Sequence, residues 1–442
     1  MSRIIEVFEH ETLHVSEDER GLRQAELDAL VRWSDAHGGQ VFDVGHRRIK
    51  LRSFVGYLEV GDLAIAILPK ADRGAPGSPQ VWRAGLLEMI CVALGLRIER
   101  TTAAAQQLAR LRLLDLIALG FIAELEPLMH SGLAKGYQRV AANGAVFRGR
   151  LAIADHIRDN AARADRFFVE HPTYDHDIAI NRVLAAALHT LAGRALSPHA
   201  RSGVAACLAR LPEVRHTGVT RELLERIRLT RSTQRYHAAL VYARMILEHQ
   251  GPQLRAGPRR VFALLFDMNA LWERYVAALF RRTRVPGVAV TTQERHLFWR
   301  SPDDAGRHVR PDIVVRAAPR SGRGQPLLVI DTKWKVPAHG RASDEDLKQM
   351  FVYNELLAGA RAVLLYPATA ESAAVRGTYA GKGHTCEQLY LGLLDAQAGW
   401  STAALSAQIR ALLEDARAAA ALEEDASRNH GRLICAPTSP GE

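Results

Sequence analysis

The chain has 442 residues, of which 48% are hydrophobic and 24% are charged, as in ordinary soluble globular proteins. This length suits two or three domains, each with its own core. No apolar run reaches 18 residues and the N-terminus lacks the layout of a signal peptide, so we expect a cytoplasmic protein without a membrane segment. The formal net charge of +10 mildly favours a polyanionic partner, although many basic proteins bind none.

Residues 1–80 predict a small β-rich module. Ile4–Glu9 is typical of a strand, and Leu22–Trp33 has the apolar spacing of a helix. Short apolar segments separated by turns then predict further strands at Val41–Val44, Ile49–Leu51, Phe54–Leu58 and Leu63–Leu68. Nothing in this module has a catalytic pattern.

Residues 81–255 predict a mainly helical region. The expected helices are Val81–Leu94, Gln107–Met129, Leu184–Leu191, Gly203–Leu211, Leu223–Leu229 and Ala238–Leu247. Within this region, the Asn143-Gly144 pair predicts a turn between two strands. Arg148 and Arg150 beside it suit either phosphate or partner contacts, or an ordinary charged surface.

Two groups of residues resemble metal ligands by type only. His171, Asp175, His176 and Asp177 lack ligand spacing on any regular element, so we expect them to form caps and turns. The cysteines are widely scattered and contain no CxxC pair, which predicts a reduced, structural set. They are Cys91, Cys207, Cys386 and Cys435.

The turn-forming pairs Gly251-Pro252 and Gly257-Pro258 predict a linker, and we place the main domain boundary there. Residues 256–400 then alternate between helices and strands, which predicts an α/β domain. The expected elements are a helix at Val261–Arg282, strands at His308–Val315 and Leu327–Lys335, a helix from Ser343 and a strand at Ala362–Pro367. Residues 401–442 predict a last helix, Thr402–Ala421, and a disordered tail from Glu423.

The first of these strands has Asp312 near its start, and the second ends in Asp331 and Lys333. The glycine-rich run Arg320–Gly324 between them predicts a hairpin that brings Asp312 beside Asp331. Because side chains alternate along a strand, Asp331 and Lys333 share one face. Mg²⁺ takes one or two protein carboxylates and leaves positions for water and phosphate oxygens, while an adjacent lysine can orient or deprotonate the attacking water. We therefore predict that Asp312 and Asp331 bind Mg²⁺, or Mn²⁺ in its place, for phosphodiester cleavage.

These residues resemble the PD-D/ExK nuclease superfamily, with Pro311-Asp312 and Asp331-Thr332-Lys333 as the two halves of its motif. The resemblance extends to its RecB-like branch, in which Glu273 corresponds to an accessory acid, and Gln349 and Tyr353 to a Gln-x-x-x-Tyr motif. It implies that Glu273 assists catalysis and that Gln349 and Tyr353 orient DNA or support the site. Glu273 equally suits the polar side of an ordinary helix. Arg310 and Lys335 suit phosphate contacts or solvated charge.

The N-terminal half is similar to the McrC family. Phe54–Leu58 is followed by a run ending in Ile65, Ile67, Pro69 and Lys70, which matches the family's I-x-I-x-P-K signature, and Asp177 and Asn181 match a later Asp-x-x-x-Asn helix start. The resemblance implies a DNA endonuclease subunit of a McrBC-like restriction system for modified cytosine. Its implied partners are double-stranded DNA and a McrB-like AAA+ GTPase hexamer docked on the N-terminal half.

GTP would act only through that partner, because the chain has no G-x-x-x-x-G-K-[ST] loop. Two other functions remain open at the level of sequence. One is a catalytically silent adaptor of the motor, against which the three intact residues Asp312, Asp331 and Lys333 argue. The other is a stand-alone RecB-like repair nuclease, against which the long N-terminal half argues.

Overall fold

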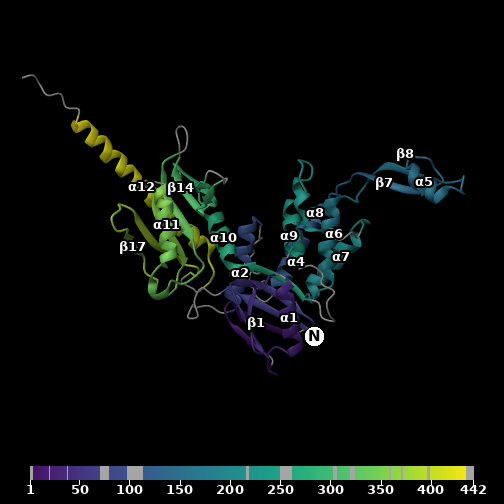
Figure 1. Cartoon of the computed structure of the whole chain (residues 1–442), viewed down its shortest axis with the longest axis horizontal. Coiled ribbons are helices and arrows are strands. Elements are labelled where there is room, and N and C mark those ends of the chain that lie inside the picture. Colours follow the sequence, from purple (N-terminus) through teal and green to yellow (C-terminus); the bar gives the residue numbers. More distant parts are fainter. Residues whose placement is uncertain are drawn as a thin grey trace, which may run out of the picture.

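The computed structural model describes most of the chain as three parts arranged in a row (Figure 1). A β-rich module lies at the centre, an α/β domain on one side, and a helical region with a projecting arm on the other. The described residues are 3–18, 20–36, 38–69, 79–96, 113–215, 219–248, 261–301, 306–318, 324–357, 360–369, 372–395 and 399–434. The linker glycine–proline pairs, the 320–323 turn, Lys70 and Cys435 therefore lie outside the described residues.

The N-terminal module contains a four-stranded sheet in the order β1-β6-β5-β10. Its strands are β1 (Arg3–Phe8), β5 (Phe54–Val60), β6 (Leu63–Leu68) and β10 (Val261–Asp267). Helix α1 (Gln24–Ala36) and a smaller sheet close one face, and the smaller sheet consists of β2 (Thr12–His14), β3 (Phe42–Gly45) and β4 (Arg48–Leu51). The predicted strands are therefore present, and β2 is an addition.

Strand β10 corrects the prediction of one long helix from Val261. Residues Val261–Asp267 pair antiparallel with β5 of the N-terminal sheet, and the helix begins only at Met268. The run VFALLFD is apolar on both faces, which suits a buried strand as well as a helix. Gly56 permits the pairing: its φ is +135° and a Cβ there would meet the Leu264 carbonyl oxygen at 2.0 Å. A segment from beyond the expected linker thus completes the first sheet.

The helical region packs into the same core as the module. Its helices are α2 (Pro79–Leu94), α4 (Leu113–His130), α6 (Ala179–Ala192), α7 (Pro198–Arg210), α8 (Arg221–Arg226) and α9 (His237–Glu248), close to the predicted positions. Asp175 forms the expected turn, since its Oδ1 accepts a hydrogen bond from the Asp177 amide at 3.0 Å. Asp177 binds Arg182 and Arg215, which lowers its pKa to about 2. The described cysteines, Cys91, Cys207 and Cys386, are buried and free.

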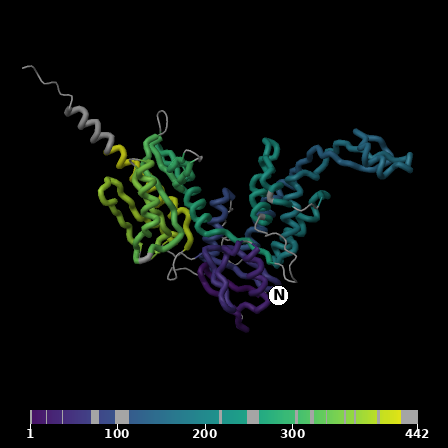
Figure 2. Tube along the Cα trace, viewed as in Figure 1, coloured from purple at the N-terminus to yellow at the C-terminus, as the bar shows by residue number. Residues whose placement is uncertain are grey.

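The arm projects from the helical region, as the trace in Figure 2 shows. It consists of β7 (Gly136–Gly144), β8 (Arg150–Leu151), β9 (Phe167–Asp175) and the short helix α5 (Ile153–Asn160). The predicted Asn143-Gly144 turn is wrong: both residues continue β7 and pair with Phe168 and Phe167 of β9. The nine-residue pairing with β9 replaces the local turn that the dipeptide favours, and β8 pairs with the other edge of β9.

The C-terminal α/β domain contains a six-stranded sheet in the order β11-β14-β15-β16-β18-β17. These strands are β11 (Val288–Thr292), β14 (Ile313–Ala317), β15 (Pro326–Thr332), β16 (Arg361–Pro367), β17 (Val375–Thr378) and β18 (Thr385–Leu391). Helix α11 (Asp344–Leu356) covers one face, whereas α10 (Met268–Arg282) and α12 (Thr402–Ile434) cover the other. A separate hairpin, β12 (His296–Trp299) and β13 (Arg307–Val309), stands beside the sheet.

The last helix extends past its predicted end. We expected disorder from Glu423, but α12 continues to Ile434. Alanine, glutamate and arginine are strong helix formers, and they dominate this segment. Among the described residues, no helix is both long and apolar enough to cross a membrane.

Candidate active site

Asp312 and Asp331 lie side by side at the end of the β14–β15 hairpin. Ile313 pairs with Ile330 in an antiparallel register, so the residues just beyond them, Asp312 and Asp331, face one another. Oδ2 of Asp312 accepts hydrogen bonds from the amide (2.7 Å) and the hydroxyl (2.9 Å) of Thr332. The side chain of Asp331 is almost completely buried. The structure thus brings together the two acids that the sequence placed on neighbouring strands.

Lys333 and Gln349 complete a small network around Asp331. Nζ of Lys333 lies 2.6 Å from Asp331 Oδ2 and donates to Gln349 Oε1 at 3.0 Å. The amide nitrogen of Gln349 in turn donates to Asp331 Oδ1 at 3.1 Å. Gln349 therefore holds the carboxylate and the ammonium in one arrangement.

Tyr353 supports this network from the next turn of α11. Its hydroxyl accepts a hydrogen bond from Gln349 Nε2 at 2.8 Å and donates one to the Arg310 carbonyl at 3.1 Å. Residues four apart on a helix share a face, which is why Gln349 and Tyr353 both point to the site. Helix α11 begins where predicted, since Ser343 caps it by accepting from the Asp346 amide. The Arg310 side chain itself is exposed.

Asp346, on the same helix, was not predicted as a site residue. Its Oδ2 lies 2.6 Å from Nζ of Lys335, and its Oδ1 lies 3.8 Å from Nζ of Lys333. The sequence presented Asp346 only as an acid in a first helical turn, where acids are common. Lys335 is therefore held by a carboxylate in this structure.

Glu273 reaches the site from α10 through a residue that the sequence did not single out. Gln293 donates from Nε2 to Glu273 Oε1 at 2.6 Å and to Asp312 Oδ1 at 3.3 Å. Its backbone is held in the left-handed region (φ +56°), and its amide donates to the Asp312 carbonyl at 3.1 Å. A glutamine in a polar turn carries no sequence signal, so only the fold reveals this bridge.

Burial and the mutual repulsion of carboxylates shift the pKa values of the site residues. Burial raises the pKa of Asp312 and of Asp331 above the usual range, and neighbouring carboxylates add to the rise. Burial also raises the pKa of Glu273. For Lys333, burial would lower the pKa, but Asp331, Asp346 and Asp312 outweigh it and raise the pKa. Lys333 is therefore an ammonium at neutral pH, beside carboxyl groups whose pKa values are raised.

The carboxyl groups suit a divalent cation. Oδ2 of Asp331 is buried and receives no well-directed hydrogen bond, although it contacts the Lys333 ammonium. Within the part of the chain that the structure describes, no three His, Cys, Asp or Glu side chains are arranged to hold a metal together. Two carboxylates are nevertheless the set that Mg²⁺ commonly uses, with waters in its other positions. Asp312 and Asp331 thus fit Mg²⁺ by number and by type.

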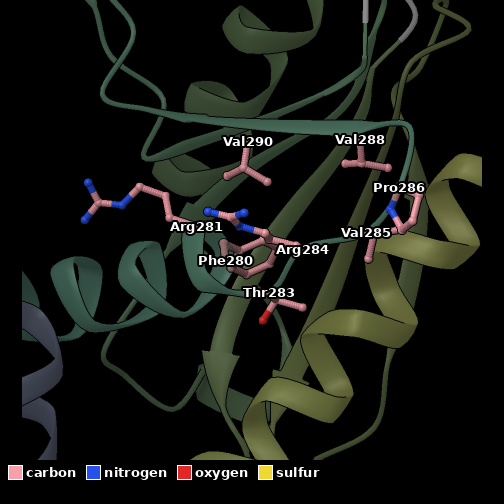
Figure 3. Close-up of a pocket in the computed structure, with 8 residues that line it drawn as sticks. All are labelled: Phe280, Arg281, Thr283, Arg284, Val285, Pro286, Val288 and Val290. Atoms are coloured by element: carbon pink, nitrogen blue, oxygen red, sulfur yellow. The ribbon is translucent and has the colours of Figure 1, made fainter.

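A separate cavity of about 480 Å³ lies at the C-terminal end of α10, beside β11 and α12 (Figure 3). None of the candidate site residues lines this cavity. The lining residues are Phe280, Arg281, Thr283, Arg284, Val285, Pro286, Val288 and Val290. The candidate site is accordingly the carboxylate cluster rather than this cavity.

The fold and the site define a multidomain α/β protein with an acid–lysine cluster at the end of a mixed sheet. Its sequence matches the family described as "McrBC 5-methylcytosine restriction system component" over residues 49–367. Because this match spans most of the chain, the protein belongs to that family. A comparison with curated proteins gives no match.

Solved structures that resemble the chain include the following two. One is a half-complex from a tetradecameric assembly of Thermococcus gammatolerans McrB AAA+ hexamers with bound McrC. This chain is 19% identical to it, with a TM-score of 0.65, over 93% of this chain and 99% of that one. The other is a cryo-EM structure of the Thermococcus gammatolerans McrBC complex, with 21% identity and a TM-score of 0.45 over 63% of this chain and 88% of that one. At such identity, the first likeness establishes the shared fold.

Proposed function

We propose that this protein is the DNA endonuclease subunit of a McrBC-like restriction system, with a PD-D/ExK nuclease domain at its C-terminal end. The observation that carries the proposal is the network of Asp312, Asp331, Lys333 and Gln349. Family membership supports the assignment to a restriction system. The order of helix, strands, helix and strand around the network supports the nuclease superfamily.

In this proposal Asp312 and Asp331 hold Mg²⁺, for which Mn²⁺ is a substitute. When bound there, the ion would supply Lewis-acid chemistry for the hydrolysis. Lys333 is protonated, so it orients the attacking water and offsets negative charge on the phosphate rather than removing a proton. Gln349 keeps Lys333 beside Asp331, and Gln293 keeps Glu273 beside Asp312.

The proposed partners are double-stranded DNA and a McrB-like AAA+ GTPase hexamer. The sequence lacks a nucleotide-binding P-loop, so GTP would act through the partner. The first of the two similar structures contains McrC bound to McrB AAA+ hexamers, which supports the same kind of assembly here. We propose that the N-terminal half, residues 1–255, docks on that ring.

The test is cleavage of methylated and unmethylated plasmid DNA with Mg²⁺, by the chain alone and with its AAA+ partner and GTP. Asp331→Asn removes one carboxylate charge and is expected to lower the cleavage rate at least about 100-fold. Asp344→Asn, an exposed acid at the start of α11, is the matched control and should cleave normally.

Each alternative predicts a different result. Cleavage by the chain alone, without partner or GTP, would identify a stand-alone RecB-like nuclease. Absence of metal-dependent cleavage with intact partner binding would identify a silent adaptor. Equal cleavage by the wild type and Asp331→Asn would remove the proposed site.

A further inference from the structure

Both ends of the β12–β13 hairpin lie at the candidate site. Gln293, which binds Glu273 and Asp312, lies three residues before β12, and Asp312 lies three residues after β13. The amide of Gln293 also donates to the Asp312 carbonyl, so the two ends of the hairpin are joined. The base of the hairpin is therefore held beside the carboxylates.

The hairpin presents large apolar side chains to solvent. Leu297 is 41% exposed, and Phe298 and Trp299 are each 53% exposed. A register shift between Leu297 and Trp299 makes a bulge at Phe298, which breaks the usual alternation of faces. As a result three consecutive apolar residues are exposed together.

The same hairpin is rich in arginine. Arg295, Arg300, Arg307 and Arg310 are all exposed, and Arg307 lies directly opposite Trp299 in the register. Residues 295–301 and 306–310 contain no acidic side chain. The turn at 302–305, whose sequence includes Asp303 and Asp304, lies outside the described residues. The arginines complement the negative charge of a polyanion, and the aromatic side chains between them can stack on flat apolar groups that it carries.

We propose that the β12–β13 hairpin is a DNA wedge, in which Phe298 and Trp299 insert between or stack on bases while the arginines contact the flanking phosphates. Apolar side chains inserted at a base step unstack it and bend the duplex, and arginines bind the backbone without reading sequence. The inference rests on the proposed function, whose substrate is double-stranded DNA. It adds the element that grips the duplex beside the cut.

The length of the hairpin sets where the wedge acts. Trp299 is six residues from Gln293, and a strand rises by about 3.3 Å per residue, so the aromatic side chains lie at most roughly 20 Å from the carboxylates. Since base pairs stack about 3.4 Å apart, the distorted step lies within roughly six base pairs of the scissile phosphate. A wedge at this distance would hold the duplex while the site cuts it.

The test measures DNA binding without divalent metal, so that it does not depend on catalysis. The full-length protein, alone and with its AAA+ partner, is titrated into a short duplex carrying 2-aminopurine at successive positions. The wild type is expected to raise the 2-aminopurine fluorescence at one or two neighbouring steps. Phe298→Ala with Trp299→Ala should abolish that rise and weaken binding about 10-fold or more.

Two further variants separate the contributions. Arg300→Ala with Arg307→Ala should weaken binding on all sequences and lower the slope of log affinity against log salt by about 1–2. Val375→Ala with Leu422→Ala is the matched control, because these apolar side chains are 44% and 72% exposed on β17 and α12, outside the half proposed to dock on the ring. This control should leave DNA binding unchanged. The substituted side chains are exposed, and thermal unfolding verifies that each variant folds.

The outcomes distinguish this inference from the proposed function. Binding and 2-aminopurine fluorescence that do not change in the Phe298/Trp299 variant overturn the wedge, even if the wild type cleaves DNA. If the Phe298/Trp299 variant binds DNA normally but no longer binds the AAA+ ring, the wedge is also overturned, and the hairpin is a protein-docking surface. Hairpin-dependent DNA binding without any cleavage would support the wedge while contradicting the nuclease.

Discussion

The indole nitrogen of Trp334 donates a 2.7 Å hydrogen bond to Glu9, joining residues 325 positions apart in the chain. Glu9 directly follows β1 of the N-terminal sheet, and Trp334 directly follows Lys333 of the candidate site. The Trp334 ring also packs on Trp272 of α10, with 5.2 Å between ring centroids. The N-terminal module therefore contacts the residue next to the proposed catalytic lysine.

Trp334→Phe tests the importance of this contact for stability. The substitution keeps an aromatic ring but removes the donor to a buried carboxylate, which we expect to lower the free energy of unfolding by about 1–3 kcal/mol. Urea unfolding of the full-length protein measures the change. Trp299→Phe, in which the replaced indole is exposed, is the control, and equal stability of both variants would contradict the prediction.

Gln293→Ala tests the bridge between Glu273 and Asp312. Losing an amide that holds two carboxyl groups is expected to reduce the cleavage rate by about 10- to 100-fold, as for other residues that orient metal ligands. Because Gln293 is exposed, unfolding should change little. Cleavage assays with the partner and GTP provide the measurement, and Gln24→Ala on α1 is the control. An unchanged rate would remove Gln293 and the bridge from the proposed site.

The raised pKa values of Asp312 and Asp331 predict a pH dependence of metal binding. In the folded protein these groups hold their protons to higher pH than in the unfolded chain, so their protonation stabilises the metal-free fold at acidic pH and this contribution is lost as pH rises. A cation requires both groups ionised, so Mg²⁺ affinity should fall from about pH 8 to about pH 5.

Calorimetric titration with Mg²⁺ or Mn²⁺ across this pH range checks the expectation. Asp331→Asn should bind weakly at every pH, because one of the two carboxylates is absent. Affinity of the wild type that does not vary with pH would show that these two groups do not bind the ion.

Gly56→Ala tests the close approach of β10 to β5. A Cβ would meet the Leu264 carbonyl oxygen at 2.0 Å, and the φ of +135° is unfavourable for alanine. We expect a loss of more than about 1 kcal/mol in unfolding free energy. Gly377→Ala in β17 is the control, because a Cβ there meets no atom within 4 Å. Similar thermal unfolding of the two variants would contradict the prediction.

Local patterns were sufficient to predict the β14–β15 hairpin and helix α11. They therefore also predicted that Asp312, Asp331, Lys333 and Gln349 lie together. Strand alternation and helical spacing act over a few residues, so the sequence reveals them directly. Gln293 and Asp346 were missed because nothing in their neighbours along the chain indicates what lies beside them in space. Strand β10 and the Asn143-Gly144 segment were misread because distant strands, β5 and β9, decide their conformation.

The late arrival of β10 has a consequence for how the protein is made. Val60 of β5 cannot pair with Val261 until that residue has been synthesised. Strand β5 therefore has no partner on that edge while about 200 residues are added. At roughly 5–20 residues per second this interval lasts about 10–40 seconds. During it, the nascent chain exposes an unpaired strand edge, a known risk for aggregation. A fragment that stops before residue 261 would carry this open edge permanently, so expression of the N-terminal half should extend through Asp267.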